Sequence, residues 1–524
     1  MNITVLVVGA GPVGLTMAAE LARYGVTVRV VDKAASRTDR SKALVLWSRT
    51  LELLDRCPDA DGGPGSAPFV HAGFRVVAAN IVAGDRRVGR IDLSTVDSPY
   101  PFALMLPQSE TERLLDERLG RLGVTVERAV ELTAFADRGD RVEALLRHAD
   151  GRDEPVTADW LVACDGTHST VRHGLAVPFA GETLDSDWIL ADVHLTGYPV
   201  PDTEMSIYWQ RDGACVIFPI SPGRYRVLAD MPGTGDERPP TPTLAQAQAV
   251  IDRRGPGGVT AFDPIWLAGF RINGRKVAGY RHGRAFLAGD AAHVHSPAGG
   301  QGMNTGMQDA FNLAWKLAMV VNRTAGDQLL DSYSPERSAV GDDVLKAAGR
   351  LTAVATMRNP LARAVRNAVG HLLLGLRPVR RAFADAMTEV TIGYPDGPLN
   401  GPSAAGLSPA AGERLAPVTG QPPAGSGPAP RFALFAARTA AIAALLDEYT
   451  DLVAPDVRPP PRGNGVWLVR PDGYVAAVVN AGDVHELDRY LAALGAGGTH
   501  RRPSVKDLVG DGKLIAAGGL EKNL

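Results

Sequence analysis

The sequence predicts an α/β protein with a domain built on a parallel sheet, a β-rich domain inserted into it, and a small C-terminal α/β domain. Three observations predict this fold. A glycine-rich turn joins a buried strand to a helix at the start of the chain. The middle of the chain is rich in short strands and turn signals. Strand and helix patterns resume after a Gly- and Pro-rich stretch at about 393–430.

The first 32 residues predict a strand, a turn, a helix and a second strand. Ile3–Val8 is rich in β-branched residues, as a strand buried on both faces should be. Gly25 can end the helix, because glycine tolerates the left-handed conformation that is common at this position. Val26–Val31 is then the second strand. The apolar side of the helix is formed by Leu15, Ala18, Ala19, Leu21 and Ala22.

The turn has the spacing of a dinucleotide-binding fingerprint, Gly9-Ala10-Gly11-Pro12-Val13-Gly14, and Asp32 ends the following strand. Gly9 permits the tight turn, Gly11 lets the backbone approach a pyrophosphate, and Gly14 lets helix and strand pack closely. The amino end of the helix offers N–H groups to phosphates. Asp32 can accept hydrogen bonds from ribose hydroxyls. The opening segment is therefore interpreted as a Rossmann-like dinucleotide site.

The middle of the chain predicts antiparallel strands. Met205–Met231 has the pattern of a meander, with a hairpin signal at Asp212-Gly213 and a second turn at Ser221-Pro222-Gly223. Strands of the parallel sheet return at Trp160–Asp165 and Ala285–Asp290. The expected division assigns 1–70, 100–178 and 279–392 to the nucleotide-binding domain with trailing helices, 71–99 and 179–278 to a β-sheet domain for substrate, and 393–524 to the C-terminal domain.

Helical patterns dominate from Asp290 to about Met387. The arginine-rich part, Met357–Met387, is expected to pack on the main body with solvated arginines rather than on a membrane. In the C-terminal domain a helix is expected at Ala433–Leu446, loops at about 455–465, strands at Gly465–Val469 and Tyr474–Val479, and a helix at Val484–Leu494. The last 28 residues are Gly-rich and polar and predict no element.

Composition narrows the class of protein. A net charge of −3 gives no general attraction to nucleic acid or to an acidic membrane. Cys57, Cys164 and Cys215 are isolated, which argues against disulfides and cysteine metal sites and favours a reducing cytoplasm. There is no signal-peptide pattern, and no apolar run is long enough for a spanning helix. We expect a cytoplasmic protein, a monomer or homodimer, with no metal, nucleic-acid or membrane partner.

Further motifs indicate which dinucleotide is bound. Gly289-Asp290 ends a buried strand and is followed by the loop Ser296–Asn304 and a helix. This segment resembles the flavin-binding GD motif of class A flavoprotein aromatic hydroxylases. Cys164–Arg172 resembles the DG motif of that family, and Gln108 and the fingerprint at Gly9–Gly14 fit it too. The resemblance covers about residues 1–350, with its motifs in the expected order.

The resemblance implies FAD as cofactor and assigns roles to single residues. Asp290 would bind the ribityl chain, Asp32 the AMP ribose and Gln108 the region between ribityl and phosphate, while Asp165 and Arg172 would lie near the pyrophosphate and the nicotinamide approach. The family often has an arginine where this chain has Lys42, and Arg40 could substitute for it. The full expected cofactor set is Gly9, Gly11, Pro12, Val13, Gly14, Asp32, Lys33, Lys42, Gln108, Asp165, Gly289, Asp290, Pro297, Gly302, Met303 and Asn304.

The resemblance also implies the reaction, the hydroxylation of an aromatic small molecule with NADPH (or NADH) and O2 through a flavin C4a-hydroperoxide. No second Gly-x-Gly-x-x-Gly follows a strand, so the nicotinamide would dock only transiently while the flavin moves. Pro297, Gly299 and Gly300 would adjoin the reacting part of the flavin. The glycine cluster Gly299, Gly300 and Gly302 would allow the loop to accommodate that motion. A dry pocket is needed, because water would release H2O2.

The substrate pocket is expected between the meander and this loop. Its candidate walls are Phe102, Trp209, Val216, Phe218, Pro219 and Tyr225, although core packing explains each of them equally well. No histidine stands out as a general base among His71, His282, His293 and His295. A polycyclic, polyketide-type substrate is the leading interpretation. Baeyer–Villiger oxygenation, simple phenol hydroxylation and a non-catalytic FAD-binding scaffold remain alternatives.

The C-terminal region from about 395 resembles the thioredoxin-like domain of larger members of the family, with Val466–Ala476 as its recognisable piece. A redox-active thioredoxin needs a cysteine pair, and no cysteine follows Cys215. The domain is therefore expected to be structural or interfacial.

Overall fold

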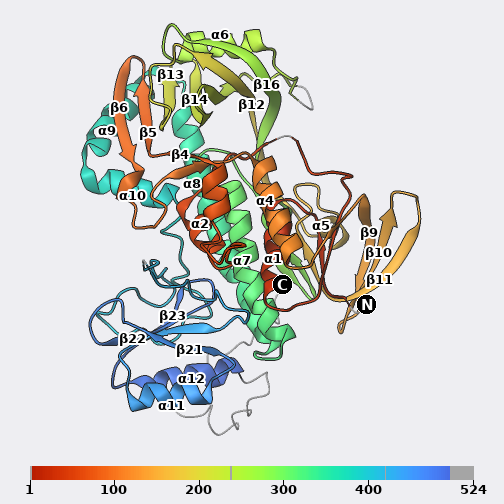
Figure 1. The fold of residues 1–524 in the computed structure, drawn as a ribbon. Coiled ribbons are helices and arrows are strands. Elements are labelled where there is room, and N and C mark those ends of the chain that lie inside the picture. The colour runs from red at the N-terminus through yellow and green to blue at the C-terminus, as the bar shows by residue number, and fades with distance from the viewer. Residues whose placement is uncertain (1–2, 40, 236–238, 419, 496–524) are drawn as a thin grey trace, which may run out of the picture.

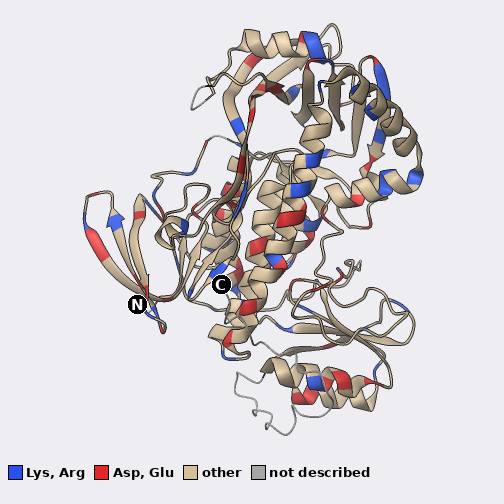
Figure 2. Cartoon of the chain, turned by 180° about the vertical axis from the view of Figure 1, so that it is seen from behind, with Lys and Arg blue, Asp and Glu red and all other residues tan. Residues whose placement is uncertain are grey.

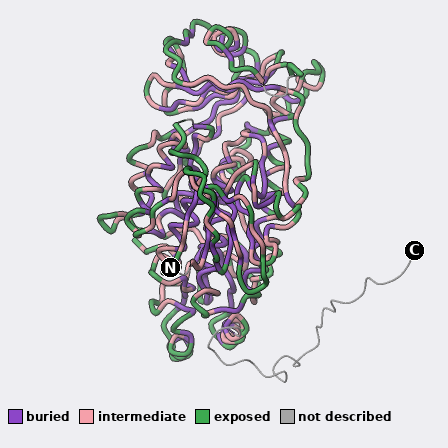
Figure 3. Tube along the Cα trace, turned by 90° about the vertical axis from the view of Figure 1, so that its right-hand side faces the viewer, coloured by how far each residue is buried: buried purple, intermediate pink, exposed green. Residues whose placement is uncertain are grey.

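The computed structural model describes residues 3–39, 41–235, 239–418 and 420–495. Arg40, proposed above as a substitute for an arginine, and the last 28 residues lie outside this part of the chain. Figure 1 shows a central body, a sheet domain above it and a C-terminal domain below it. Buried segments follow the central strands and helices and the sheet above them (Figure 3).

The first sheet carries the glycine-rich turn. β1 lies between β2 and β11 and is parallel to both, so Val7 pairs with Val30 on one side and Val162 on the other. The strand is almost fully buried, which agrees with its β-branched composition. The strands of this sheet are β1 (Ile3–Val8), β2 (Val28–Asp32), β8 (Val126–Arg128), β9 (Val130–Asp137), β10 (Val142–His148), β11 (Asp153–Ala163), β17 (Arg281–His282) and β18 (Ala285–Leu287).

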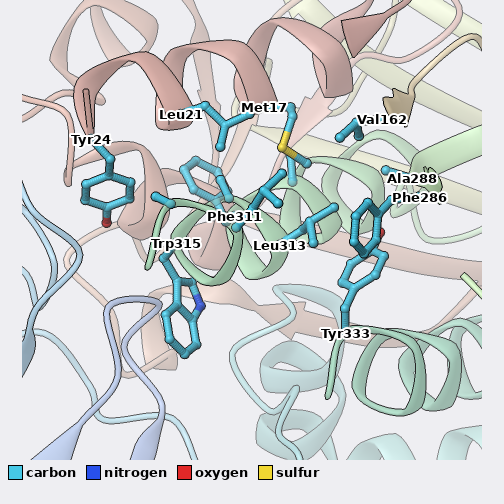
Figure 4. Close-up of a cluster of buried hydrophobic side chains, with 14 of the residues drawn as sticks. Met17, Leu21, Tyr24, Val162, Phe286, Ala288, Phe311, Leu313, Trp315 and Tyr333 are labelled. Atoms are coloured by element: carbon cyan, nitrogen blue, oxygen red, sulfur yellow. The ribbon is translucent and has the colours of Figure 1, made fainter. Parts of the chain in front are cut away.

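Two helices pack together beside this sheet. α1 (Pro12–Arg23) follows the turn, and Gly25, with φ +77°, lies just beyond its end as expected. α7 (Gly302–Val321) runs through the centre of the molecule and is buried along most of its length. In Figure 4, Phe311 and Leu313 of α7 lie among apolar side chains that include Met17 of α1. This packing fixes the amino end of α7 relative to the parallel sheet.

The second sheet forms the inserted domain. Its order is β19-β16-β12-β15-β14-β13-β5-β6. The predicted meander is correct, because β13, β14 and β15 pair antiparallel around the two expected turns. α6 (Leu244–Arg254) covers one face, and the other faces the first domain. The strands are β5 (Ala78–Ala83), β6 (Arg86–Asp92), β12 (Ala180–Thr196), β13 (Glu204–Gln210), β14 (Gly213–Ser221), β15 (Arg224–Met231), β16 (Thr260–Lys276) and β19 (His293–Val294).

The C-terminal sheet has the order β21-β20-β22-β23, in which β20 and β21 are parallel and the other pairs antiparallel. The chain order strand, helix, strand, strand, strand, helix is that of a thioredoxin-like core. Its elements are β20 (Phe432–Phe435), α11 (Ala440–Glu448), β21 (Val453–Arg458), β22 (Gly465–Val469), β23 (Val475–Asn480) and α12 (Val484–Gly495).

Two expectations for this domain were wrong. The start of the predicted helix at Ala433–Leu446 is strand β20, and the helix α11 begins only at Ala440. A short apolar run does not distinguish a buried strand from a buried helix by its period. β21 was also missed, because the prolines around Val453–Arg458 predicted a loop. This strand lies at the edge of the sheet, where proline is tolerated.

Smaller elements connect these parts. The predicted strand Ala285–Asp290 ends at Leu287, and a tight helical turn η2 (Gly289–Ala291) follows it. The predicted strand at Val26–Val31 begins at Val28 and ends at Asp32. The remaining elements are β3 (Val45–Leu46), α2 (Ser48–Leu54), α3 (Ala67–Ala72), β4 (Phe74–Val76), η1 (Leu93–Thr95), β7 (Ala103–Met105), α4 (Gln108–Arg121), α5 (Thr170–Gly174), η3 (Asp327–Ser332), α8 (Tyr333–Ala355), α9 (Pro360–Gly375) and α10 (Arg377–Met387).

The arginine-rich helix α9 packs against the inserted domain, and Arg366 is buried over the ring of Trp209, whereas the sequence predicted packing on the main body with solvated arginines. The space beside Gly370 of α9 is filled by Val88 and Trp209, and Leu374 fills the space beside Gly89. None of the described helices is long and apolar enough to cross a membrane. Acidic and basic residues are interspersed over the ribbon in Figure 2.

Candidate functional site

A groove of about 570 Å³ separates the first domain from the inner face of the second sheet. A second hollow of about 210 Å³ continues it past the glycine-rich turn. The two share Gly11, Lys33 and Asp165 among their walls, so they form one elongated channel. The following expected residues line it: Gly9, Gly11, Pro12, Val13, Asp32, Lys33, Lys42, Gln108, Asp165, Asp290, Pro297, Gly300, Gly302 and Met303.

The glycines of the turn act in different ways. Gly9 has φ +97°, and a Cβ there would lie 2.4 Å from the carbonyl oxygen of Cys164. A Cβ on Gly14 would lie 1.9 Å from the Gly9 oxygen, so Gly14 serves packing and does not line the channel. The space beside Gly11 is open, which leaves the backbone accessible at the start of α1. The turn therefore presents backbone to the channel.

Asp32 closes the turn from the next strand. Its carboxylate accepts the N–H of Ala10 at 2.7 Å and the N–H of Ala34 at 2.8 Å. Arg128 lies 3.5 Å from the same carboxylate. Each carboxylate oxygen has more than one lone pair, so Asp32 can still accept from hydroxyl groups in the channel.

The turn that carries Asp290 is held from behind by a buried ion cluster. Asp309 on α7 accepts the N–H of Gly289 at 2.9 Å and lies 2.8 Å from His293 and 2.7 Å from Arg337. Gly289 itself packs on Val13, since a Cβ there would lie 2.8 Å from that side chain. Arg337 holds the pKa of Asp309 below its usual value against the effect of burial. The sequence analysis missed Asp309, because its partners are distant along the chain.

Asp290 reaches from this turn into the channel. Its side chain touches solvent, yet the protein surrounds the carboxyl closely enough that desolvation raises its pKa. Thr167 donates to it at 3.4 Å, and the nearby Lys42 opposes the rise in pKa. The carboxyl is thus available to a polar ligand.

The loop before α7 is tied to the first domain through Asn304. This side chain is buried, accepts the N–H of Trp47 at 2.9 Å and donates to the carbonyl oxygens of Val45 and Gly300. Asn304 does not line the channel, and its hydrogen bonds join the loop before α7 to the segment of Val45 and Trp47. Trp47 also donates to the carbonyl of Gly299, which is not among the residues that line the channel. The first N–H groups of α7, which have no partner within the helix, begin beside Gly302 at the channel.

Asp165 and Arg172 have different surroundings. Burial raises the pKa of Asp165, and its Oδ1 has no hydrogen-bond partner among the described residues. Arg172 is buried and does not line the channel. It donates to the carbonyls of Thr167 and Ala291, and so joins the two loops that flank Asp290.

Gln108 supports the segment that contains Lys42. It accepts the N–H of Ala43 at 3.2 Å and donates to Glu112 at 2.9 Å. Lys42 itself is exposed in the channel beside Lys33. The two ammonium groups supply positive charge in a site that also contains Asp32, Asp165 and Asp290.

Of the six expected substrate-pocket residues, Phe218 lines the channel. Alternation along β14 and β15 puts Phe218, Arg226 and Leu228 on the inner face and Tyr225 on the face covered by α6. Trp209 lies under Arg366 of α9, and Phe102 lies beneath Arg75. The five residues that do not line the channel are Phe102, Trp209, Val216, Pro219 and Tyr225.

Arg226 is a wall residue that the sequence analysis missed. It is buried, pairs with Asp192 at 2.7 Å and donates to the carbonyls of Ser41 and Lys42. It therefore links the second sheet to the segment that carries Lys42. Its position in an alternating strand was visible in the sequence, but the direction of its side chain was not.

Of the four histidines, only His295 lines the channel. Burial and the nearby His293 lower its pKa to about 4, and its Nε2 has no hydrogen-bond partner among the described residues. His293 pairs with Asp309, His282 bonds to the carbonyl of Gly279, and His71 is exposed. Within the described residues no group of three or more His, Cys, Asp or Glu side chains is placed to hold a metal.

The channel fits an elongated dinucleotide flavin. Backbone at the glycine turn, carboxylates at Asp32 and Asp290 and the amino end of α7 lie along one hollow. The unpartnered Oδ1 of Asp165 and Nε2 of His295 are buried polar atoms that a ligand can satisfy.

Comparison with known proteins agrees with this geometry. Residues 2–348 match the FAD binding domain family. The chain is 41% identical over 415 residues to 6-methylpretetramide 4-monooxygenase of Streptomyces rimosus, which covers 77% of this chain and 73% of that enzyme. The structure of OxyS anhydrotetracycline hydroxylase from Streptomyces rimosus superposes with a TM-score of 0.77 at 28% identity, over 95% of this chain and 100% of that chain. CabE, an aromatic hydroxylase from angucycline biosynthesis, gives a TM-score of 0.75 at 29% identity, over 94% and 99%.

Proposed function

This chain belongs to the FAD binding domain family of flavin-dependent monooxygenases, and from this we propose that it hydroxylates a polycyclic aromatic substrate of the polyketide type. The observation that carries the proposal is the single channel that runs from the glycine turn, past Asp290 and the amino end of α7, to the inner face of the second sheet. The relatives named above, which are named for 6-methylpretetramide and anhydrotetracycline or come from angucycline biosynthesis, favour this substrate class.

The domains divide this work as the sequence suggests. Residues 1–70, 100–178 and 279–392 hold FAD, residues 71–99 and 179–278 cover the substrate, and residues 393–524 are a thioredoxin-like appendage. The glycine turn and the amino end of α1 receive the pyrophosphate, and Asp32 accepts from the adenosine ribose. Asp290 and the segment held by Gln108 bind the ribityl chain. Lys33 and Lys42 neutralise phosphate charge.

FAD bound in this channel would, with NADPH or NADH as reductant, supply the chemistry that activates O2. The chain's own residues orient the ring and keep water out. N–H groups at the amino end of α7, beside Gly302 and Met303, stabilise negative charge that develops there. Pro297 and Gly300 shape the wall next to it, and Phe218 and Leu228 offer an apolar face to an aromatic substrate. His295, neutral at physiological pH, can accept a hydrogen bond from a phenolic hydroxyl through Nε2.

Labelled O2 tests the proposed reaction. The purified protein should bind FAD and, with NADPH and a polycyclic phenol, should form a product that carries one labelled oxygen on a ring carbon. A ring-expanded ester or lactone would instead identify Baeyer–Villiger oxygenation. NADPH oxidation with no oxygenated product from any polycyclic phenol, quinone or simple phenol would contradict the proposal.

The variant Asp290→Ala tests whether Asp290 contributes to FAD binding without being needed for folding. We expect this variant to keep its circular dichroism spectrum and to lose FAD affinity by about tenfold or more, the equivalent of one charge-assisted hydrogen bond. Asp140→Ala, a change in an exposed turn, is the control and should bind FAD like the parent. Equal affinity in both variants would remove Asp290 from the proposed site.

A further inference from the structure

A second, smaller cavity lies between the first domain and the C-terminal domain. Its volume is about 50 Å³. Arg49, Glu52 and Arg56, from α2 and the turn after it, form one wall. The opposite wall is apolar and includes Leu415, Phe435 and Val469, and Arg458 of β21 completes the lining.

Arg56 is the unusual residue of this cavity. Its side chain is only 3% exposed. Among the described residues it has no hydrogen bond or ion pair, and its contact is the ring of Phe311, 5.7 Å away. A buried cation without a counter-charge is expensive, so such groups normally have a partner.

The neighbouring charges do not neutralise Arg56. Glu52 is fully engaged, because it accepts from Arg49, Arg414 and Ser98. The carboxylate of Asp472 is bound by Arg470. Glu20 pairs with Arg23. Burial, followed by the charge of Arg49, lowers the pKa of Arg56 to about 10, so the guanidinium stays charged at neutral pH.

The two guanidinium groups converge at one point. A Cβ built on Gly473 would lie 3.5 Å from Nη2 of Arg56 and 3.6 Å from Nη2 of Arg49. Arg49 also pairs with Glu52 and donates a hydrogen bond to the carbonyl of Asp472. Its Nε has no partner among the described residues. Arg458 donates to the carbonyl of Pro422 and is likewise partly desolvated. Three cations therefore border a cavity that contains one carboxylate.

We propose that this interdomain cavity is a binding site for a small oxyanion of the phosphate or sulfate class, held by Arg56 and Arg49. Arginine forks match the oxygens of such anions in a two-point contact. The cavity has room for several water-sized groups but not for a nucleotide. The anion would join α2 to the C-terminal domain, and Phe311 would extend this contact to α7.

Thermal unfolding of the full-length holoprotein tests the site at constant ionic strength. An anion that binds the folded chain raises Tm by mass action. We expect Tm to rise by roughly 2–4 °C between phosphate-free buffer and about 10 mM phosphate, with sulfate acting similarly and chloride much less. Arg56→Met should abolish this rise. Arg438→Met, a change at an exposed arginine of the C-terminal domain, should leave it unchanged.

Two outcomes would overturn the proposal: a parent Tm that does not respond to phosphate, or a response that persists in Arg56→Met. Crystals of the parent soaked in selenate give a second measurement that does not depend on the folding of Arg56→Met. Anomalous scattering should place a selenium atom beside Arg56, and an empty cavity there would refute the site. Neither measurement depends on flavin chemistry, so the proposed function stands or fails separately.

Discussion

The carboxylate of Asp309 on α7 accepts the backbone N–H of Gly289 over 2.9 Å, which joins the helix at the channel to the turn that carries Asp290. The same carboxylate is paired with Arg337 and with His293. The position of Asp290 thus depends on an ion cluster that itself lies outside the channel lining.

Asp309→Asn tests this dependence. It leaves Arg337 buried without its counter-charge, and breaking a buried pair typically costs about 3–5 kcal/mol. We expect urea unfolding of the apoprotein to show a loss of this size, together with weaker FAD binding. The double variant Asp309→Leu, Arg337→Met leaves no unpaired charge, so it should recover part of the stability lost in Asp309→Asn, but not the FAD affinity, because leucine offers no acceptor to the Gly289 N–H. Full recovery of both would show that the cluster does not position the turn.

Gly9→Ala should damage the flavin site more than an alanine at another left-handed glycine. Both Gly9 and Gly25 have positive φ, at +97° and +77°, so each alanine costs about 1–2 kcal/mol of backbone strain. At Gly9 the new Cβ also meets the carbonyl of Cys164, whereas at Gly25 it meets open space. FAD titration should show lost binding for Gly9→Ala and near-parental binding for Gly25→Ala. Equal losses of FAD affinity in the two variants would mean that backbone strain, and not the contact with the Cys164 carbonyl, explains the need for glycine at position 9.

His295 should make the apoprotein less stable in mild acid. Its pKa in the folded state is about 4, below the unfolded value of 6.5, so the unfolded chain binds the extra proton between these values. The stability from the neutral ring is therefore fully present above pH 6.5 and is lost as pH falls towards 4, up to about 3 kcal/mol.

His295→Gln removes this titration. Urea unfolding measured between pH 7 and 4.5 should give a shallower decline for the variant than for the parent. Parallel curves would show that His295 titrates normally. Burial is the main cause of the lowered pKa of His295. If the channel opened and solvent reached the ring, the parent and His295→Gln would therefore differ less in their loss of stability.

Phe218→Ala should impair substrate use while leaving flavin binding intact. Removal of the ring from the inner face of β14 enlarges the pocket and admits water. We expect the KM for the aromatic substrate to rise by roughly tenfold and more NADPH to be consumed with release of H2O2. Tyr225→Phe, on the opposite face of the neighbouring strand, should keep parental coupling. Equal effects of both changes would contradict the assignment of faces.

Many of the residues that line the channel near the glycine turn could be predicted from the sequence. Glycine spacing, the acid after β2 and the Gly289-Asp290 turn are local features, and each depends on backbone conformation within a few residues. Asn304, a predicted cofactor residue, is not among the residues that line the channel, and its contacts with Trp47 and Val45 form only on folding. Of the residues predicted to form the substrate pocket, Phe102, Trp209, Val216, Pro219 and Tyr225 do not line the channel. Strand alternation shows that Phe218 and Tyr225 lie on opposite faces but not which face is inward.

The sequence by itself determined the α/β class, the dinucleotide turn, the hairpins of the inserted domain and the absence of cysteines after Cys215. These follow from short-range patterns of glycine, apolar residues and charge. Only the tertiary structure decided that Arg226 and Leu228 line the channel, that Asp309 holds the Asp290 turn, and that Arg56 is buried without an ion pair to another described residue. Burial and charge pairing depend on residues that are distant in the chain and meet only on folding, so a local sequence pattern cannot predict them.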